Sequence, residues 1–239
     1  MHTRATRTRQ GRRPLAVAAG IGALLLTTAR GATAAPEGQG GDAARDPGSR
    51  WVSIGILGGS TRLHHGLADY QWDMTPRVDW GAQTLVGSGR FAAGLRLWRT
   101  QTTQQIDPAD PTAAARVGAT STELVGHGRL ATTLGCDVVA VASAGLLHLG
   151  YHPDRVTITP TGGGGPIAVD LLPVNEWIGG AGLALRRPLR GPWAAGVELD
   201  HRLFALDTAH RNGSVIEYGR QTFGDWSARL ELAWVSRRP

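Results

Sequence analysis

The sequence predicts an all-β chain in which eight antiparallel strands form an up-and-down barrel, and three observations carry this prediction. Apolar and polar residues alternate in one segment after another, which is the pattern of a half-buried strand. Long and short connections alternate strictly between these segments. The apolar faces of the clearest segments carry no charge for about 9–11 residues, the length that a tilted strand needs to cross a membrane.

The eight predicted strands cover residues 51–59, 77–86, 91–100, 117–132, 137–151, 167–185, 193–204 and 224–234. The clearest is the last, where Trp226, Leu230 and Trp234 lie on one face and charged residues such as Arg229 and Glu231 lie on the other. The barrel is therefore expected to span residues 51–235, followed by a short C-terminal tail over residues 236–239.

The predicted long connections are 60–75, 102–115, 152–165 and 206–214, and the short ones are 87–89, 133–136 and 186–192. In an up-and-down sheet this order places every long loop at one end of the barrel and every tight turn at the other. The two later long connections also contain hairpin signals, at Asn212-Gly213 and on both sides of the glycine run 162–165. We therefore expect strand extensions within these two loops.

The first 34 residues have the pattern of a cleaved secretory signal. They carry six arginines and no acid, and Leu15–Leu26 is an uncharged run that is too short to span a bilayer. Ala32 and Ala34 supply the small residues that signal peptidase requires before a cut after Ala34. Residues 35–50, rich in Gly, Pro and charge, are expected to form a disordered periplasmic linker.

The basic charge of the chain belongs to this signal. The full sequence has a formal net charge of +6, with 25 arginines, no lysine and 19 acidic residues. Removal of the signal leaves 19 arginines against 19 acids, which argues against a nucleic-acid partner. The missing lysine excludes Schiff-base chemistry and a Walker A site, and the single Cys136 excludes an internal disulfide.

A secretory signal, an even number of alternating strands and long loops at one end together resemble the small bacterial outer-membrane β-barrels of the OmpA-transmembrane, OmpX and OmpW type. The C-terminal segment is similar to the assembly signal of these barrels, because Ser227, Leu232 and Trp234 match it, although Arg229 stands where Gly is usual. The resemblance implies insertion in the bacterial outer membrane, with outer-membrane lipid as a partner.

Aromatic residues near strand ends favour lipid on the outside of the barrel, as in an interfacial girdle. The predicted girdle consists of Tyr151, Trp177, Trp193, Trp226 and Trp234. The apolar face is also rich in Ala and Gly, which would pack a soluble core poorly. A soluble lipocalin-like periplasmic barrel is the alternative, because such a barrel alternates too.

With lipid outside, the polar face lines the lumen. The predicted lumen residues are Asp79, Arg96, Glu123, His127, Arg129, Glu176, Glu198, Asp200, Arg202, Arg229 and Glu231. An eight-stranded barrel is only wide enough for its own side chains, and a buried charge without a partner is costly. We therefore expect these residues to form an ion-paired plug.

Sites for chemistry are few. His64, His65 and Asp69 could hold a metal, but adjacent histidines in a polar loop are usually solvated, and no metal or cofactor is expected. Lipid A deacylases of the PagL type place a Ser two residues after a lipid-facing His, whereas His201 is followed at that position by Leu203. No catalytic residue is therefore predicted.

These observations predict a non-enzymatic outer-membrane barrel that serves as a structural or interaction platform. Its long extracellular loops or periplasmic turns would contact another envelope protein, and its lumen would be plugged. The alternatives left open are a narrow small-solute channel, a PagL-like lipid-modifying enzyme and the soluble periplasmic barrel.

Overall fold

The computed structural model describes residues 50–107, 110, 112–158, 165–212 and 215–238. The predicted signal peptide and the predicted linker, except Arg50, lie outside the described residues. No helix in the described ranges is long and apolar enough to cross a membrane.

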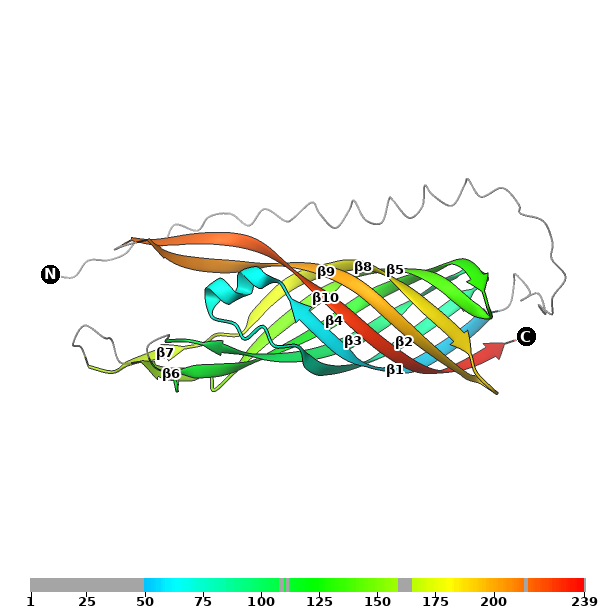
Figure 1. Cartoon of the computed structure of the whole chain (residues 1–239), viewed down its shortest axis with the longest axis horizontal. Helices are drawn as coiled ribbons and strands as arrows, with labels where there is room; N and C mark the ends of the chain where they lie inside the picture. Colours follow the sequence, from blue (N-terminus) through cyan, green and yellow to red (C-terminus); the bar gives the residue numbers. More distant parts are fainter. Residues whose placement is uncertain (1–49, 108–109, 111, 159–164, 213–214, 239) are drawn as a thin grey trace. The chain divides into compact units, whose positions relative to one another are not determined.

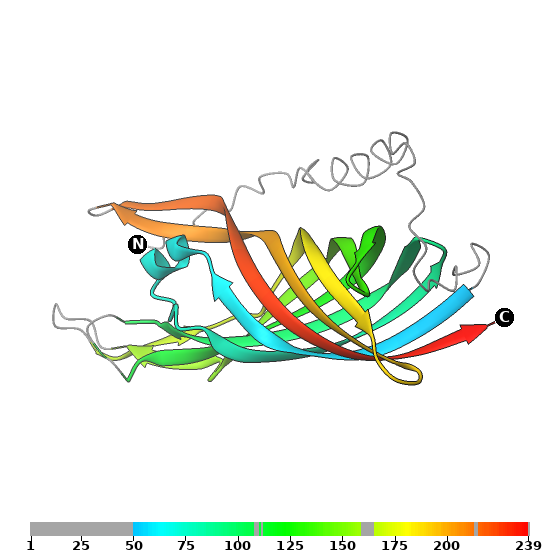
Figure 2. The same ribbon diagram turned by 45° about the vertical axis from the view of Figure 1, so that its right-hand side comes forward.

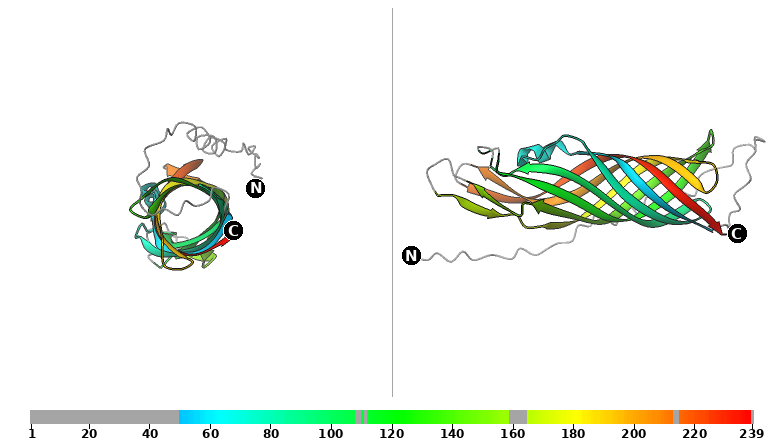
Figure 3. Two further views of the ribbon diagram at one scale, coloured as in Figure 1. Left: turned by 90° about the vertical axis from the view of Figure 1, so that its right-hand side faces the viewer. Right: turned by 90° about the horizontal axis from the view of Figure 1, so that it is seen from below.

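Eight strands close into a barrel in the order β1-β10-β9-β8-β5-β4-β3-β2, and every neighbouring pair is antiparallel (Figures 1 and 3). The strands are β1 (Arg50–Leu63), β2 (Arg77–Ser88), β3 (Phe91–Gln105), β4 (Ala114–Thr133), β5 (Cys136–His152), β8 (Val174–Pro188), β9 (Trp193–Asn212) and β10 (Val215–Arg238). The predicted eight-stranded, up-and-down antiparallel fold is confirmed.

The tight turns lie where the sequence predicts them, between β2 and β3, β4 and β5, and β8 and β9. Each contains a glycine in the left-handed region, with φ of 57° at Gly89 and 72° at both Gly135 and Gly191. A residue with a Cβ is strained there, so these glycines fix the turn positions. Both ends of the described barrel meet at this end, where Arg50 pairs with Arg238.

The opposite end differs most from the prediction, because strands occupy much of the expected loops. β9 and β10 pair with each other as far as Asn212 and Val215, and β3 and β4 pair as far as Gln105 and Ala114. Beyond Phe204, β9 pairs with β10 alone, so the β9–β10 hairpin projects past the closed wall (Figure 2).

The prediction of one strand over residues 167–185 is wrong, because the segment forms two strands. Residues Ile167–Asp170 form β7, which pairs with β6 (Arg155–Ile158) in a separate two-stranded sheet, and β8 begins only at Val174. Pro173 lies at this break and has no backbone N–H to donate to a sheet, which explains the interruption. The β6–β7 pair is the hairpin that the Thr157 and Ile167 segments predict.

The predicted C-terminal tail is also wrong for residues 236–238. β10 continues to Arg238, and its last residues pair with the start of β1. The additional pairing closes the barrel at the end where the tight turns lie.

The outer surface of the barrel is a belt of exposed apolar side chains. Its members are Ile54, Ile56, Trp80, Val86, Phe91, Leu95, Leu97, Leu124, Leu146, Trp177, Leu183, Leu185, Trp193, Val197, Leu199, Leu203, Trp226, Leu230, Leu232 and Trp234. A soluble monomer does not expose a continuous apolar surface of this extent. Because the charged side chains in the middle of these strands point inward, the barrel has the polarity of a membrane-spanning barrel.

Candidate functional site

The interior of the barrel has a charged layer in the middle and an apolar layer toward the long-loop end. Along β9 the inward-facing residues run from Phe204 through Arg202 and Asp200 to Glu198. Strand alternation therefore places the charges of neighbouring strands at the same level, where they can pair across the lumen.

Arg202 is the centre of the charged layer. Its Nε and Nη2 donate to the two carboxylate oxygens of Asp225 at 2.8 and 2.9 Å, and its Nη1 donates to Glu123 Oε1 at 3.2 Å. Nη2 also donates to Ser227 Oγ at 3.2 Å. All four side chains are buried, so this two-carboxylate arrangement is a desolvated network with strong, directional hydrogen bonds.

A second group joins Arg96 and Arg229 through Glu198. Arg96 Nη2 donates to Glu198 Oε2 at 2.8 Å, and Arg229 Nη1 donates to Glu198 Oε1 at 2.9 Å. Arg229 Nη1 also lies 2.8 Å from Asp200 Oδ1. Arg229 and Glu198 face each other directly in the β10–β9 register, so the fold itself sets this pair.

Trp98 extends this group toward the wall at β1. The guanidinium of Arg229 lies over the Trp98 ring, 4.5 Å from its centroid, in a cation–π contact. Trp98 Nε1 donates to Thr61 Oγ1 at 3.4 Å, and Thr61 Oγ1 and Ser227 Oγ are hydrogen-bonded at 2.9 Å. Strands on opposite sides of the lumen are thus joined by one connected set of side chains.

A third pair lies nearer the tight turns. Arg186 Nη2 donates to both carboxylate oxygens of Glu231, at 2.7 and 2.5 Å, and Gln83 Nε2 donates to Glu231 Oε1 at 2.6 Å. Gln83 Oε1 accepts from Arg96 Nε at 3.3 Å, so Gln83 links the Arg186–Glu231 pair to the Arg96 and Arg229 group.

The structure places most of the predicted lumen residues in this interior. Asp79, Arg96, Glu123, His127, Glu198, Asp200, Arg202 and Arg229 are buried there, and Glu231 is half-buried. Asp79 and His127 have no direct hydrogen-bond partner on their side-chain polar atoms among the described residues, so they do not belong to the connected network.

Two predicted lumen residues lie at the ends of the barrel instead. Arg129 is partly exposed beside a tight turn, 3.8 Å from Asp137. Glu176 is at the opposite end and pairs with Arg220, which also lies 3.0 Å from Asp207. Their positions on the inward face are right, but strand alternation says nothing about height along the barrel.

The lumen also contains four residues that are absent from the predicted site. Asp225, Arg186, Ser121 and Trp98 were not among the predicted lumen residues, although all four take part in the network or lie beside it. Asp225 occupies the same face of β10 as Arg229, so the period-2 pattern could have identified it.

The apolar layer closes the end of the barrel where the long connections lie. Its buried cluster consists of Leu67, Trp72, Val117, Leu147, Leu149, Ile178, Phe204, Leu206 and Phe223. Leu67 and Trp72 come from the first predicted loop, which contains the 3₁₀ helix η2 (His65–Tyr70). The prediction of a polar loop here is wrong in part, because Leu67 and Trp72 make part of the segment an apolar plug.

Backbone hydrogen bonds hold the plug against β3. Asp73 N donates to Thr103 O at 2.7 Å, and Gln105 N donates to Gln71 O at 2.9 Å. At the start of η2, His64 Nδ1 accepts from Gly66 N at 3.1 Å, which caps the helix and gives this histidine a structural role.

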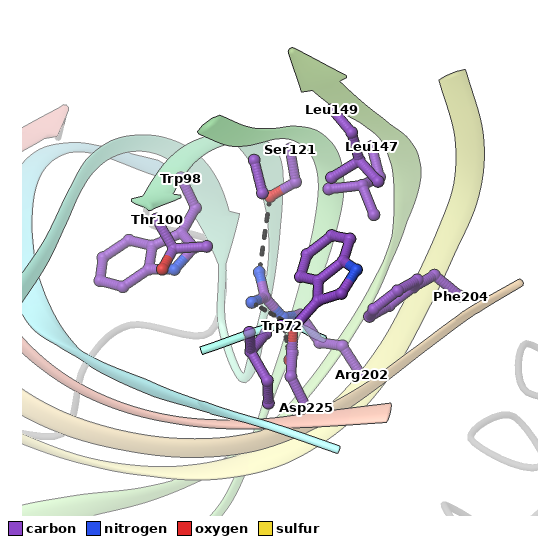
Figure 4. Close-up of a pocket in the computed structure, with 11 residues that line it drawn as sticks. Trp72, Trp98, Thr100, Ser121, Leu147, Leu149, Arg202, Phe204 and Asp225 are labelled. Atoms are coloured by element: carbon purple, nitrogen blue, oxygen red, sulfur yellow. Dashed lines mark hydrogen bonds and ion pairs between the residues drawn. The ribbon is translucent and has the colours of Figure 1, made fainter. Parts of the chain in front are cut away.

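A cavity of about 20 Å³ separates the plug from the charged layer. Trp72 and Phe204 contribute apolar walls, and Arg202, Asp225 and Ser121 contribute polar groups, as Figure 4 shows. This volume is close to the minimum that holds one water molecule. At this level the lumen is therefore filled by the side chains of the chain itself.

The carboxylate of Asp73 anchors the end of the plug segment. Its oxygens accept from Thr75 N at 2.9 Å and from Arg77 Nη2 at 2.8 Å. The hydrogen bonds from Thr75, followed by that from Arg77, lower the pKa of Asp73 to about 2. The segment is thus fastened by a group that is ionised at neutral pH.

Four of the five predicted girdle residues are exposed on the outer surface: Trp177, Trp193, Trp226 and Trp234. Tyr151 is wrong. It shares the inward face of β5 with Leu147 and Leu149 and packs against the apolar clusters inside the barrel and beneath β6. Its position at a strand end resembled that of a girdle residue, but its place in the alternation points it inward.

The histidines that were considered as candidate sites contact other aromatic rings. The ring of His201 lies against Trp226 on the outer face, with centroids 4.7 Å apart, and the rings of His64 and His65 lie 4.4 Å apart. Among the described residues, no group of three or more His, Cys, Asp or Glu side chains is arranged to hold a metal ion. Cys136 is a half-buried free thiol beside a tight turn.

No protein-family model matches the chain, and no curated protein matches it. Solved structures do align with it. The N-terminal β-barrel domain of Pseudomonas aeruginosa OprF is 16% identical over 77% of this chain and 97% of that one, with a TM-score of 0.33. The outer membrane protein AlkL is 12% identical over 85% of this chain and 98% of that one, with a TM-score of 0.43. The attachment invasion locus protein Ail of Yersinia pestis is 12% identical over 78% of this chain and 99% of that one, with a TM-score of 0.37.

The closed eight-stranded wall, the apolar outer belt and the ion-paired interior lead to one conclusion. The chain is a closed eight-stranded β-barrel with the polarity of a membrane-spanning barrel: apolar side chains outside and charged side chains inside.

Proposed function

We propose that the protein is a non-enzymatic, non-conducting barrel that anchors an interaction platform in the outer membrane. The filled interior is the observation that carries this proposal. Three arginines and four acids, Arg96, Arg202, Arg229, Glu123, Glu198, Asp200 and Asp225, are buried in ion pairs across the lumen. The apolar plug closes the same lumen a second time.

Each barrier opposes transport for a different physical reason. An ion crossing the charged layer would have to separate pairs that already satisfy one another, which leaves buried charges unpaired. A polar solute crossing the apolar layer would lose its water without gaining hydrogen bonds. This favours a closed barrel over the narrow small-solute channel.

Conductance in planar bilayers tests the closed lumen. We expect no stable current steps from the wild-type protein, whose folding is checked by its altered gel mobility before boiling. Ohmic steps that recur in wild type and change in size in Glu198→Ala or Arg229→Ala would overturn the proposal, because they would place the current in this lumen.

The platform is built from the segments that extend past the wall. The β9–β10 hairpin and the β6–β7 sheet leave the barrel at the same end, opposite the tight turns. They present polar groups, including the exposed Arg155–Asp170 ion pair at 2.5 Å. A second envelope protein would bind here.

Trypsin treatment of intact cells tests this presentation, because the chain has arginine but no lysine. We expect cleavage after Arg155 or Arg220 and none after Arg90 or Arg190, which lie in the tight turns. The reverse pattern would contradict the proposal.

The lipid A mass spectrum of cells that express the protein should also stay unchanged, since an enzyme of the PagL type would remove an acyl chain.

A further inference from the structure

Three arginines point outward from the part of the wall nearest the long-connection end. They are Arg62 on β1, Arg99 on β3 and Arg116 on β4, and all three are exposed. None of them forms a hydrogen bond or an ion pair through its side chain in the described part of the chain, whereas the lumen arginines Arg96, Arg202 and Arg229 each form an ion pair with at least one acid. Strands β1 to β4 are consecutive in the barrel, so the three arginines share one sector of the wall.

These arginines stand at the edge of the apolar belt. On β3 the outward residues are Phe91, Ala93, Leu95 and Leu97, and Arg99 is the next one. Arg99 is directly opposite Trp80 on β2, and Arg62 is directly opposite Trp226 on β10. Tryptophan marks the boundary between hydrocarbon and headgroups in membrane barrels, so the guanidinium groups lie at headgroup level.

The described side chains on the other side of the barrel lack this feature. At the corresponding end of β5, β8 and β9 the outward residues include His148, Asn175 and His201. Arg220 on β10 is held by Glu176 and Asp207. Among the side chains that the structure describes, the arginines of this end without an acidic partner therefore lie in the β1–β4 sector.

An arginine beside hydrocarbon requires an anion, because its charge is costly in an apolar environment. Among the described residues, no carboxylate pairs with Arg62, Arg99 or Arg116, while a lipid phosphate is available at this depth. The planar guanidinium also matches the oxygens of a phosphate in a bidentate contact. Strand geometry separates Arg99 from Arg116 by one strand and four residues, or about 14 Å between Cα atoms, which suits a headgroup that is several sugars or phosphates wide.

We propose that the outer wall of β1–β4 is a binding site for a phosphate-bearing lipid of the outward-facing leaflet. Arg99 and Arg62 hold the phosphate groups and Arg116 extends the site toward the headgroup. The acyl chains lie along the exposed side chains of Ile56 and Leu97. This site is separate from the interaction platform and does not depend on it.

Native mass spectrometry of the folded, full-length barrel in detergent tests the site, with dioleoyl phosphatidic acid as the probe and dioleoyl phosphatidylcholine as the competitor. We expect the wild type to retain the phosphatidic acid preferentially. The double variant Arg62→Gln/Arg99→Gln should bind it about tenfold more weakly, which is the effect of losing charge-assisted hydrogen bonds. Arg62→Lys/Arg99→Lys retains the charges and should keep most of the preference.

Arg187→Gln/Arg190→Gln is the matched control, because it removes two exposed arginines at the opposite end of the barrel. This variant should bind phosphatidic acid as the wild type does. The proposal is overturned if the Arg62/Arg99 double Gln variant keeps the wild-type preference. It is also overturned if the control loses as much binding, since any exposed arginine would then suffice.

Discussion

Arg202 shows how much a single side chain contributes to the stability of the fold when it pairs with two buried carboxylates. Substitution of Arg202→Gln leaves Asp225 and Glu123 without their common cation in the lumen. Breaking a buried pair in this way lowers the free energy of unfolding by about 3–5 kcal/mol. Urea unfolding of the barrel in lipid vesicles, followed by gel mobility without boiling, measures this loss.

Arg220→Gln is the control for that prediction, because Arg220 is also paired with two acids but is 43% exposed. Water screens this surface pair, so its loss should cost only about 0–1 kcal/mol. Equal destabilisation by the two substitutions would show that the lumen network does not stabilise the fold.

Asp73 makes the plug segment sensitive to acid. Its pKa is lowered from 3.8 to about 2 by hydrogen bonds that exist only in the folded segment, so its contribution to stability is present above pH 4. The contribution falls as pH decreases from about 4 to about 2. Pepsin, which is active in this range, should therefore cleave within residues 64–76 faster at pH 2 than at pH 4.

Asp73→Asn removes the titrating group and should remove most of this difference between pH 2 and pH 4. The same variant should be cleaved faster than wild type at pH 4, because the ion pair with Arg77 is gone. Cleavage in wild type that does not change over this range would be evidence against the anchoring role of Asp73.

Single residues were predictable where alternation alone decides the answer. The inward position of Arg202 and the outward position of Trp226 both follow from the period of two. Tyr151 was misplaced because its position near a strand end outweighed its place in the same alternation. The partners of Arg202 depend on register between strands, which one sequence does not show.

At the scale of elements, the first connection matters most, because it converts an expected loop into the plug. Leu67 is 1% exposed within the apolar cluster. Leu67→Ala should weaken the packing of η2 by about 2–4 kcal/mol through lost contacts and a new cavity. Hydrogen exchange of the backbone amides of residues 65–74 should become faster.

Leu172→Ala is the matched control, since Leu172 is 75% exposed in the segment between β7 and β8. It should leave the exchange of residues 65–74 at the wild-type rate. Unchanged exchange in Leu67→Ala would mean that the plug does not depend on this side chain.

The number and direction of the main strands were predictable, because glycine turns and alternating polarity are local signals. Their lengths were not, because β9 and β10 stabilise one another beyond the closed wall. The split between β7 and β8 has a local signal in the sequence, which is Pro173. The plug in the first connection has one too, in the apolar residues Leu67 and Trp72.

At the scale of the whole molecule, the distribution of charge explains the fold. Five acids, Glu123, Glu198, Asp200, Asp225 and Glu231, lie in the lumen, where they pair with arginines, and the wall that surrounds them is apolar. This is the reverse of a soluble barrel, which places charge outside. The sequence could predict this reversal from the long uncharged faces, whereas the identity of a partner depends on surface shape that alternation does not encode.

The central claim is that the apolar face of the wall contacts lipid. Nitroxide labels at Ile56→Cys, Leu95→Cys, Leu199→Cys and Leu230→Cys, each in a Cys136→Ser background, sample the belt on four strands. Electron paramagnetic resonance of the labelled barrel in lipid vesicles compares collisions with oxygen, which dissolves in hydrocarbon, and with a water-soluble nickel chelate. The account predicts high oxygen accessibility and low nickel accessibility at all four positions, and the opposite ratio would contradict it.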